Sequence, residues 1–164
     1  FGLVTFSNIQ HHLIRASNKP GHYQVCRQTL ENLQADHSMP DFISLHETLC
    51  YFLRRRALLF FMTNLDDQLL AMEFMQRIAP LARRHLIIAD LYLPSGIYPI
   101  FSGDHASSII EIYRQIAAHQ RWEQINELRF KLKHHDIELA TVQHDEITPL
   151  VISQYLKVKQ QQRL

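Results

Sequence analysis

The sequence has 164 residues, of which 46% are hydrophobic and 20% charged, and its formal net charge is +1. This length fits a single domain spanning residues 1–164, and the composition is too apolar for a disordered chain. A nearly neutral chain has no overall field to attract nucleic acid, and no apolar run reaches the roughly 18 residues of a membrane span. We therefore expect a cytoplasmic globular domain, with any membrane tether upstream of it.

The first third of the chain is predicted to form a hairpin and two helices. Residues 1–6 are strand-like, and residues 9–15 are expected to return beside them as an antiparallel strand. Apolar residues at helical spacing predict a helix over residues 22–33. Pro40 and Asp41 then open a second helix.

The remainder alternates strands with helices. An uninterrupted apolar run predicts a fully buried strand at residues 57–63, and a second buried strand and a last strand are predicted at residues 86–91 and 137–142. Helices are predicted from a cap at Asp66 or Asp67 to Ile78, from Asp104 to Ala118, from Trp122 to Leu132, and from Thr148 and Pro149 onward. The predicted helix from Asp104 to Ala118 carries an apolar stripe of Ile109, Ile112, Tyr113 and Ile116.

This alternation predicts an α/β fold with a doubly wound, mostly parallel sheet, to which the opening hairpin adds an antiparallel edge strand. Ligands of such sheets bind beyond the carboxyl ends of the strands, which directs attention to the loops there. The sequence lacks G-x-G-x-x-G, the P-loop pattern, G-x-S-x-G and H-E-x-x-H, so the common nucleotide, hydrolase and zinc-protease signatures are missing.

Two polar groups at strand ends are candidate sites. Asn64, Asp66 and Asp67 follow the strand at residues 57–63, and their oxygens could bind a hard cation such as Mg²⁺ or cap the next helix. His144 and Asp145 follow the last strand and could supply acid and base groups, although acidic residues there also favour the start of the closing helix.

Four segments carry a resemblance that runs in order along the whole chain. They are FGLVTFSN at residues 1–8, RRRALLFFMTNLDD at 54–67, LARRHLIIADL at 81–91 and VISQYLKVKQQQRL at 151–164. Together they resemble the bacterial von Willebrand factor A-like proteins catalogued as domain-of-unknown-function family fifty-eight. The resemblance implies the Rossmann-like von Willebrand factor A fold.

The first central strand of that fold carries an Asp-x-Ser-x-Ser motif, and the present sequence begins after it. We therefore expect an N-terminally truncated domain whose open sheet permits self-association. The loop that should carry a threonine ligand offers only Asp41, and Asn64 stands where the family has an aspartate. This pattern indicates an incomplete or degenerate metal-ion-dependent adhesion site, with Asn64 and Asp66 as weak metal ligands and Mg²⁺ bound, if at all, by the intact protein.

The function implied by the resemblance is a non-enzymatic protein–protein interaction module without a cofactor in this chain. A MoxR-type AAA+ ATPase is the partner that the family implies, and Ser7, Asp41, Asn64 and Asp66 are the expected binding residues. The competing hypothesis is a small-molecule-binding or hydrolytic α/β domain that uses His144 and Asp145 at the same strand-end edge.

Overall fold

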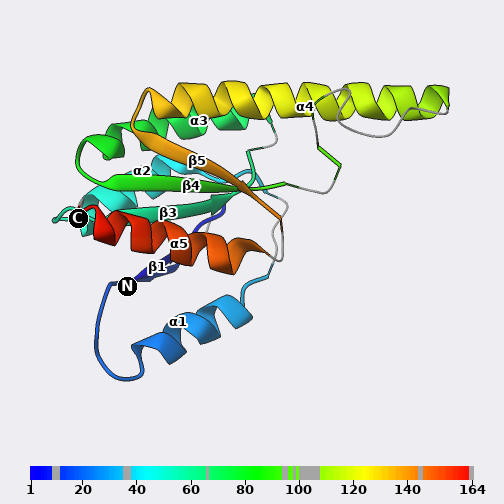
Figure 1. The fold of residues 1–164 in the computed structure, drawn as a ribbon. Coiled ribbons are helices and arrows are strands. Elements are labelled where there is room, and N and C mark those ends of the chain that lie inside the picture. The colour runs from blue at the N-terminus through cyan, green and yellow to red at the C-terminus, as the bar shows by residue number, and fades with distance from the viewer. Residues whose placement is uncertain are drawn as a thin grey trace. The chain divides into compact units, whose positions relative to one another are not determined.

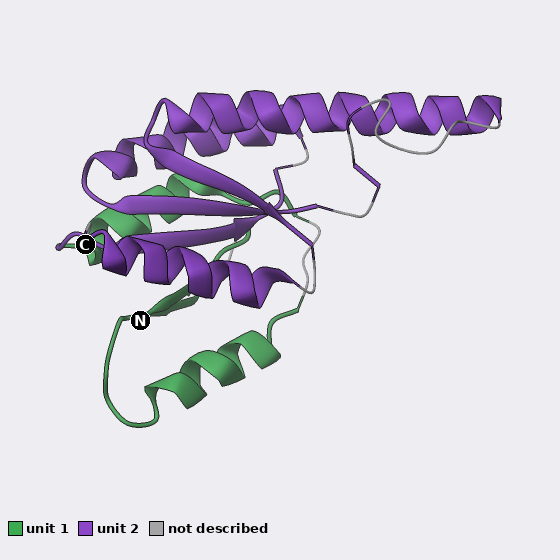
Figure 2. Ribbon diagram, viewed as in Figure 1, with its two compact units in different colours: residues 1–54 green, residues 55–164 purple. Residues whose placement is uncertain are grey.

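The computed structural model describes residues 1–8, 12–34, 38–65, 67–93, 96–97, 99, 108–143 and 146–162. The chain divides into two compact units, residues 1–54 and residues 55–164 (Figure 2). Each unit contains a sheet of its own. No helix among the described residues is long and apolar enough to cross a membrane.

The first unit contains the predicted hairpin and the two predicted helices. Strand β1 (Leu3–Thr5) pairs antiparallel with β2 (His12–Ile14). Helices α1 (His22–Glu31) and α2 (Phe42–Phe52) follow. In the described residues the hairpin forms a separate two-stranded sheet, whereas the sequence predicted that it would extend the parallel sheet.

The second unit is built on a three-stranded parallel sheet in the order β3-β4-β5 (Figure 1). The strands are β3 (Leu58–Thr63), β4 (Leu86–Tyr92) and β5 (Ile137–Val142), each within one residue of its prediction. Parallel neighbours need long crossovers, and helices supply them here. The result is a mixed α/β arrangement compatible with a Rossmann-like fold.

Helices cover both faces of this sheet. Helix α3 (Gln68–Ile78) and the short helix η1 (Ala79–Arg83) connect β3 to β4, and α4 (Ile109–Lys133) connects β4 to β5. Both long helices lie on the same face, while α5 (Ile147–Gln160) lies on the opposite one (Figure 1). This is the expected arrangement, because consecutive right-handed crossovers in one direction place their helices on one face.

Alternation along the strands decides which residues meet which helix. Phe61 of β3 faces α3, where its ring lies edge-on to Phe74 at a centroid distance of 5.5 Å. Asp90 of β4 and Glu138 of β5 face α5, with which both make polar contacts. The apolar side chains between the α3–α4 face and the sheet form much of the core of this unit, including Phe74, Ile78, Leu91, Leu132 and Ile137.

Helix α4 corrects two sequence predictions. The expected break between Ala118 and Trp122 is absent, because the intervening His-Gln-Arg contains neither proline nor glycine and a single helix continues through it. The cap is Ser108, whose hydroxyl oxygen accepts a hydrogen bond from the Glu111 amide at 3.2 Å. The predicted cap at Asp104 lies outside the described residues.

Helix α5 also begins earlier than predicted. Its first residue is Ile147, so that Thr148 lies inside the first turn and is not the cap. Pro149 is tolerated at this position because the first amides of a helix have no carbonyl partner within it.

Candidate functional site

The carboxyl ends of the three parallel strands converge at one end of the second unit, where the sequence predicted a site (Figure 1). Asn64 follows β3 there and is exposed. Asp67 is the N-cap of α3, and its Oδ1 accepts a hydrogen bond from the Leu69 amide at 2.6 Å. This confirms one of the two alternatives for the cap, whereas Asp66 lies outside the described residues.

Ser7 and Asp41 belong to the first unit and lie close together. The Asp41 amide donates to the Ser7 carbonyl oxygen at 3.3 Å. Asp41 is the N-cap of α2, at the place where the sequence predicted that this helix opens, and its Oδ1 accepts from the amides of Ile43 and Ser44, both at 3.0 Å. Asp41 therefore acts as a helix cap, which satisfies two amides that have no other partner in the helix.

The described carboxylates at the predicted site are thus engaged as caps. In the described part of the chain, no three His, Cys, Asp or Glu side chains gather closely enough to hold a metal ion. A divalent cation would have to compete with the helix amides for Asp41 or Asp67. The side chains that are described here do not fit a complete divalent-cation centre of the kind that prefers several oxygen ligands.

His144 and Asp145, the proposed acid and base of the competing hypothesis, lie outside the described residues. A shallow hollow is lined by residues on either side of them in the sequence, including Thr141, Glu146 and Ser153. A second groove lies between α3 and α4 and is lined by apolar Met72, Met75 and Leu128, with Arg121 and Glu127 among its polar residues.

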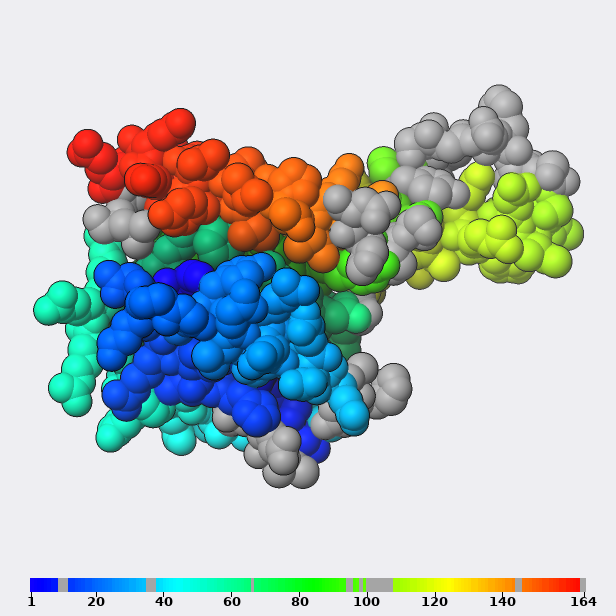
Figure 3. Space-filling model, turned by 90° about the horizontal axis from the view of Figure 1, so that it is seen from below, coloured from blue at the N-terminus to red at the C-terminus, as the bar shows by residue number. Residues whose placement is uncertain are grey.

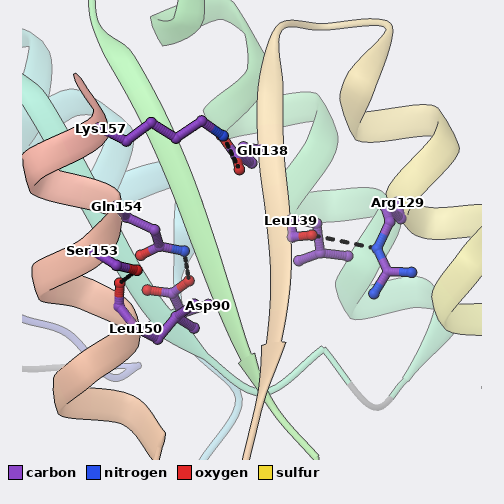
Figure 4. Close-up of polar contacts among 8 residues, drawn as sticks. All are labelled: Asp90, Arg129, Glu138, Leu139, Leu150, Ser153, Gln154 and Lys157. Atoms are coloured by element: carbon purple, nitrogen blue, oxygen red, sulfur yellow. Dashed lines mark hydrogen bonds and ion pairs between the residues drawn. The ribbon is translucent and has the colours of Figure 1, made fainter. Parts of the chain in front are cut away.

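The structure reveals a buried polar pair that the sequence did not predict. Asp90 of β4 is 3% exposed, and Gln154 of α5 is 6% exposed. The Gln154 Nε2 donates to Asp90 Oδ1 at 2.8 Å (Figure 4). The pair therefore links α5 to β4, the central strand of the sheet, by a hydrogen bond within the core.

The other two oxygens of this pair have no hydrogen-bond partner among the residues that the structure describes. They are Asp90 Oδ2 and Gln154 Oε1, and both are fully buried. Figure 4 shows both oxygens on the same side of the pair. Two such acceptors repel if the carboxyl is ionised, whereas a proton on Oδ2 can be donated to Oε1. A protonated Asp90 would thus complete a cyclic acid–amide pair with two hydrogen bonds.

The surroundings of Asp90 favour that proton. Burial raises the pKa of Asp90, the hydrogen bond from Gln154 opposes this rise, and the negative charge of Glu138 adds to it. Lys157 Nζ on α5 lies 3.4 Å from Glu138 Oε1 (Figure 4). The positive charge of Lys157 is therefore paired with the exposed carboxylate of Glu138 and not with Asp90. On β3, the residue beside Asp90 is Met62, which has no charge that could shift the pKa of Asp90.

A different kind of surface is present at the amino-terminal half of α4. This part of the helix extends past the end of the sheet and stands out from the second unit (Figures 1 and 3). Its apolar side chains are exposed, by 72% for Ile109, 73% for Ile110, 47% for Ile112, 69% for Tyr113 and 39% for Ile116. We call Ile109, Ile112, Tyr113 and Ile116 the α4 stripe, because they recur at the spacing of one helix face.

The carboxyl-terminal half of α4 behaves differently. Ile125, Leu128 and Leu132 are buried, and Arg129 donates from Nε to the Leu139 carbonyl oxygen at 3.4 Å. Half of the helix is therefore part of the core, and the other half presents apolar residues to solvent.

Comparison of the chain with protein-family models, with curated proteins and with solved structures found no match.

Proposed function

We propose that this chain is a non-enzymatic protein–protein interaction module whose contact surface is the α4 stripe. The observation that carries the proposal is the exposure of Ile109, Ile112, Tyr113 and Ile116 on one face of a projecting helix. Contiguous apolar residues of this size on a surface are characteristic of binding sites, because exposing them to water is unfavourable. A helix face with this spacing fits a hydrophobic groove of a partner.

We propose a MoxR-type AAA+ ATPase as the partner, in accordance with the resemblance of the sequence to the von Willebrand factor A-like family. Ser7, Asp41 and Asn64 are proposed to contribute polar contacts through the loops that carry them. The adhesion-type metal site is proposed to be degenerate, because Asp41 and Asp67 both serve as helix caps.

The partner is tested by measuring association of the protein with a purified MoxR-type ATPase by sedimentation velocity, in ATP and in ADP. The replacement Ile112→Glu should weaken the complex by roughly thirtyfold, as expected for a residue in the centre of an apolar interface. The matched control is Ile152→Glu on α5, since Ile152 is 54% exposed and lies outside the stripe.

Equal loss of binding in both variants would contradict the assignment of the surface. A wild-type protein that does not bind the ATPase in either nucleotide would contradict the assignment of the partner. Calorimetry with Mg²⁺ tests the degenerate site separately: we expect no binding, and stoichiometric binding that disappears in Asn64→Ala would show a functional metal site.

A further inference from the structure

On the side away from β4, the backbone of β3 pairs with no other strand of the described residues. The Ala57 carbonyl accepts from the Leu86 amide at 2.9 Å, so Ala57 directs its backbone toward β4. Backbone groups alternate in direction along a strand, and those of Leu58, Phe60 and Met62 therefore point away from β4. Within the described part of the chain, no strand pairs with β3 on that side.

The side chains of β3 are those of an interior strand. The sequence LLFFMT is apolar on both faces and contains no charge and no proline. Edge strands of stable proteins normally carry charged residues or proline, since an unprotected edge recruits further strands. Met62 is nonetheless 55% exposed, and Phe60 is only half-buried. The edge therefore combines hydrogen-bonding groups that no described strand pairs with and accessible apolar side chains.

The opposite edge of the same sheet is protected. The Val142 carbonyl accepts from the Leu93 amide on the β4 side, so the Leu139 carbonyl, three residues earlier, points outward. Arg129 occupies this outward carbonyl and also donates to Thr141 Oγ1 at 3.3 Å. Protection of β5 by an arginine leaves β3 as the edge at which the sheet can be extended.

We propose that a second copy of this chain pairs its own β3 antiparallel across this edge, with the twofold axis at Phe60. In this register each outward-facing residue meets another one: Phe60 meets its own copy, and Leu58 meets Met62. Residues in such pairs exchange both of their backbone hydrogen bonds. The proposal is independent of the α4 stripe and goes beyond the proposed partner.

Charge at the ends of β3 selects the antiparallel orientation. Arg55 and Arg56 precede the strand and are exposed, and Asp67 follows it and is also exposed. Antiparallel pairing brings the basic end of one copy beside the acidic end of the other, where opposite charges attract. Parallel pairing would place the basic ends side by side.

The first test uses the unaltered chain. Sedimentation equilibrium over a range of concentrations should show a monomer–dimer equilibrium that weakens as salt is added. Hydrogen exchange should show the amides of Phe60 and Met62 protected only at concentrations where the dimer forms. The amides of Leu59 and Phe61 bond to β4 and are the internal control, protected at all concentrations. A protein that stays monomeric, or a dimer with unprotected Phe60 and Met62 amides, overturns the proposal.

The second test removes one outward donor. Met62→Pro deletes an amide that makes no bond to β4, and proline is tolerated on a strand edge. Two hydrogen bonds are lost per dimer by symmetry, so the dissociation constant should rise about tenfold or more. Met62→Leu keeps the amide and is the matched control. A dimer that survives Met62→Pro but is lost in Ile112→Glu would assign self-association to the α4 stripe and overturn the β3 register.

Discussion

The side chain of Gln154 on α5 reaches into the core and donates a hydrogen bond of 2.8 Å to the carboxyl group of Asp90 on β4. Both side chains are almost completely buried, and each has a second oxygen to which no described residue donates a hydrogen bond. An unsatisfied buried acceptor costs free energy, and an ionised carboxylate costs more. The protonation state of Asp90 is therefore coupled to how firmly α5 is held against the sheet.

We predict that Asp90→Asn stabilises the protein at neutral and alkaline pH. The asparagine amide nitrogen can donate to Gln154 Oε1, while its oxygen accepts from Gln154 Nε2, so both acceptors are accommodated without a charge. The free energy of unfolding should increase by roughly 1–3 kcal/mol at pH 8. Urea unfolding monitored by circular dichroism measures this change.

The same variant should remove part of the pH dependence of stability. The pKa of Asp90 is raised above its ordinary value of 3.8 in the folded protein. The folded state therefore holds a proton that the unfolded state has released, and the free energy of unfolding falls as the pH rises from about 4 through the folded pKa. In Asp90→Asn this fall should be smaller. A steeper or unchanged fall would contradict a raised pKa of Asp90 in the folded protein.

We predict that Gln154→Leu destabilises the protein and raises the pKa of Asp90 further. The leucine fills a similar volume but offers no donor, so Asp90 loses its only described hydrogen bond. The loss should be roughly 1–3 kcal/mol in free energy of unfolding. Because the hydrogen bond from Gln154 lowers the pKa of Asp90, carboxyl-carbon NMR titration should detect its removal as an upward shift. The control is Ser153→Ala, which removes a hydroxyl that donates to the Leu150 carbonyl on the exposed side of the same helix.

We predict that Asp67→Ala destabilises the protein by about 1 kcal/mol, the usual cost of removing a helix N-cap. Asp67→Ser should restore most of this loss, since a serine hydroxyl also accepts from the amide of Leu69. Thermal unfolding of the three proteins provides the comparison. A ligand role for the carboxylate would give the opposite pattern, in which serine fails to substitute and Mg²⁺ changes the unfolding temperature only in the wild type.

The sequence predicted the strands of the parallel sheet well because each is a short, mostly apolar segment. Residues 57–63 contain no charged residue, which indicates burial on both faces, whereas residues 86–91 and 137–142 contain Asp90 and Glu138. The start of a helix at Pro40 and Asp41 was also confirmed, as was Asp67, one of the two alternatives for a cap, since helix starts depend on a few neighbouring residues. Local chemistry did not decide every boundary, since the cap predicted at Thr148 and the helix break predicted after Ala118 were both wrong.

The Asp90–Gln154 pair was missed because its members lie 64 residues apart and only the fold brings them together. Asp90 did leave a signal, as a lone carboxylate inside the apolar run LIIADL. Gln154 left none, since a glutamine on a helix is normally exposed. The periodicity of Ile109, Ile112, Tyr113 and Ile116 predicted an apolar helix face. An apolar face of this kind usually covers a sheet, and the periodicity alone could not show that this part of α4 extends past the sheet.

The unequal edges of the parallel sheet also bear on how large an assembly can become. Twofold pairing through β3 uses the open edge of each copy, and the outward edge that remains on both sides is β5, where Arg129 already binds the Leu139 carbonyl. Strand addition then stops after one step, because a closed symmetric contact leaves no template for a third molecule. An apolar strand of the kind that initiates fibres would in this way be confined to a finite, soluble particle.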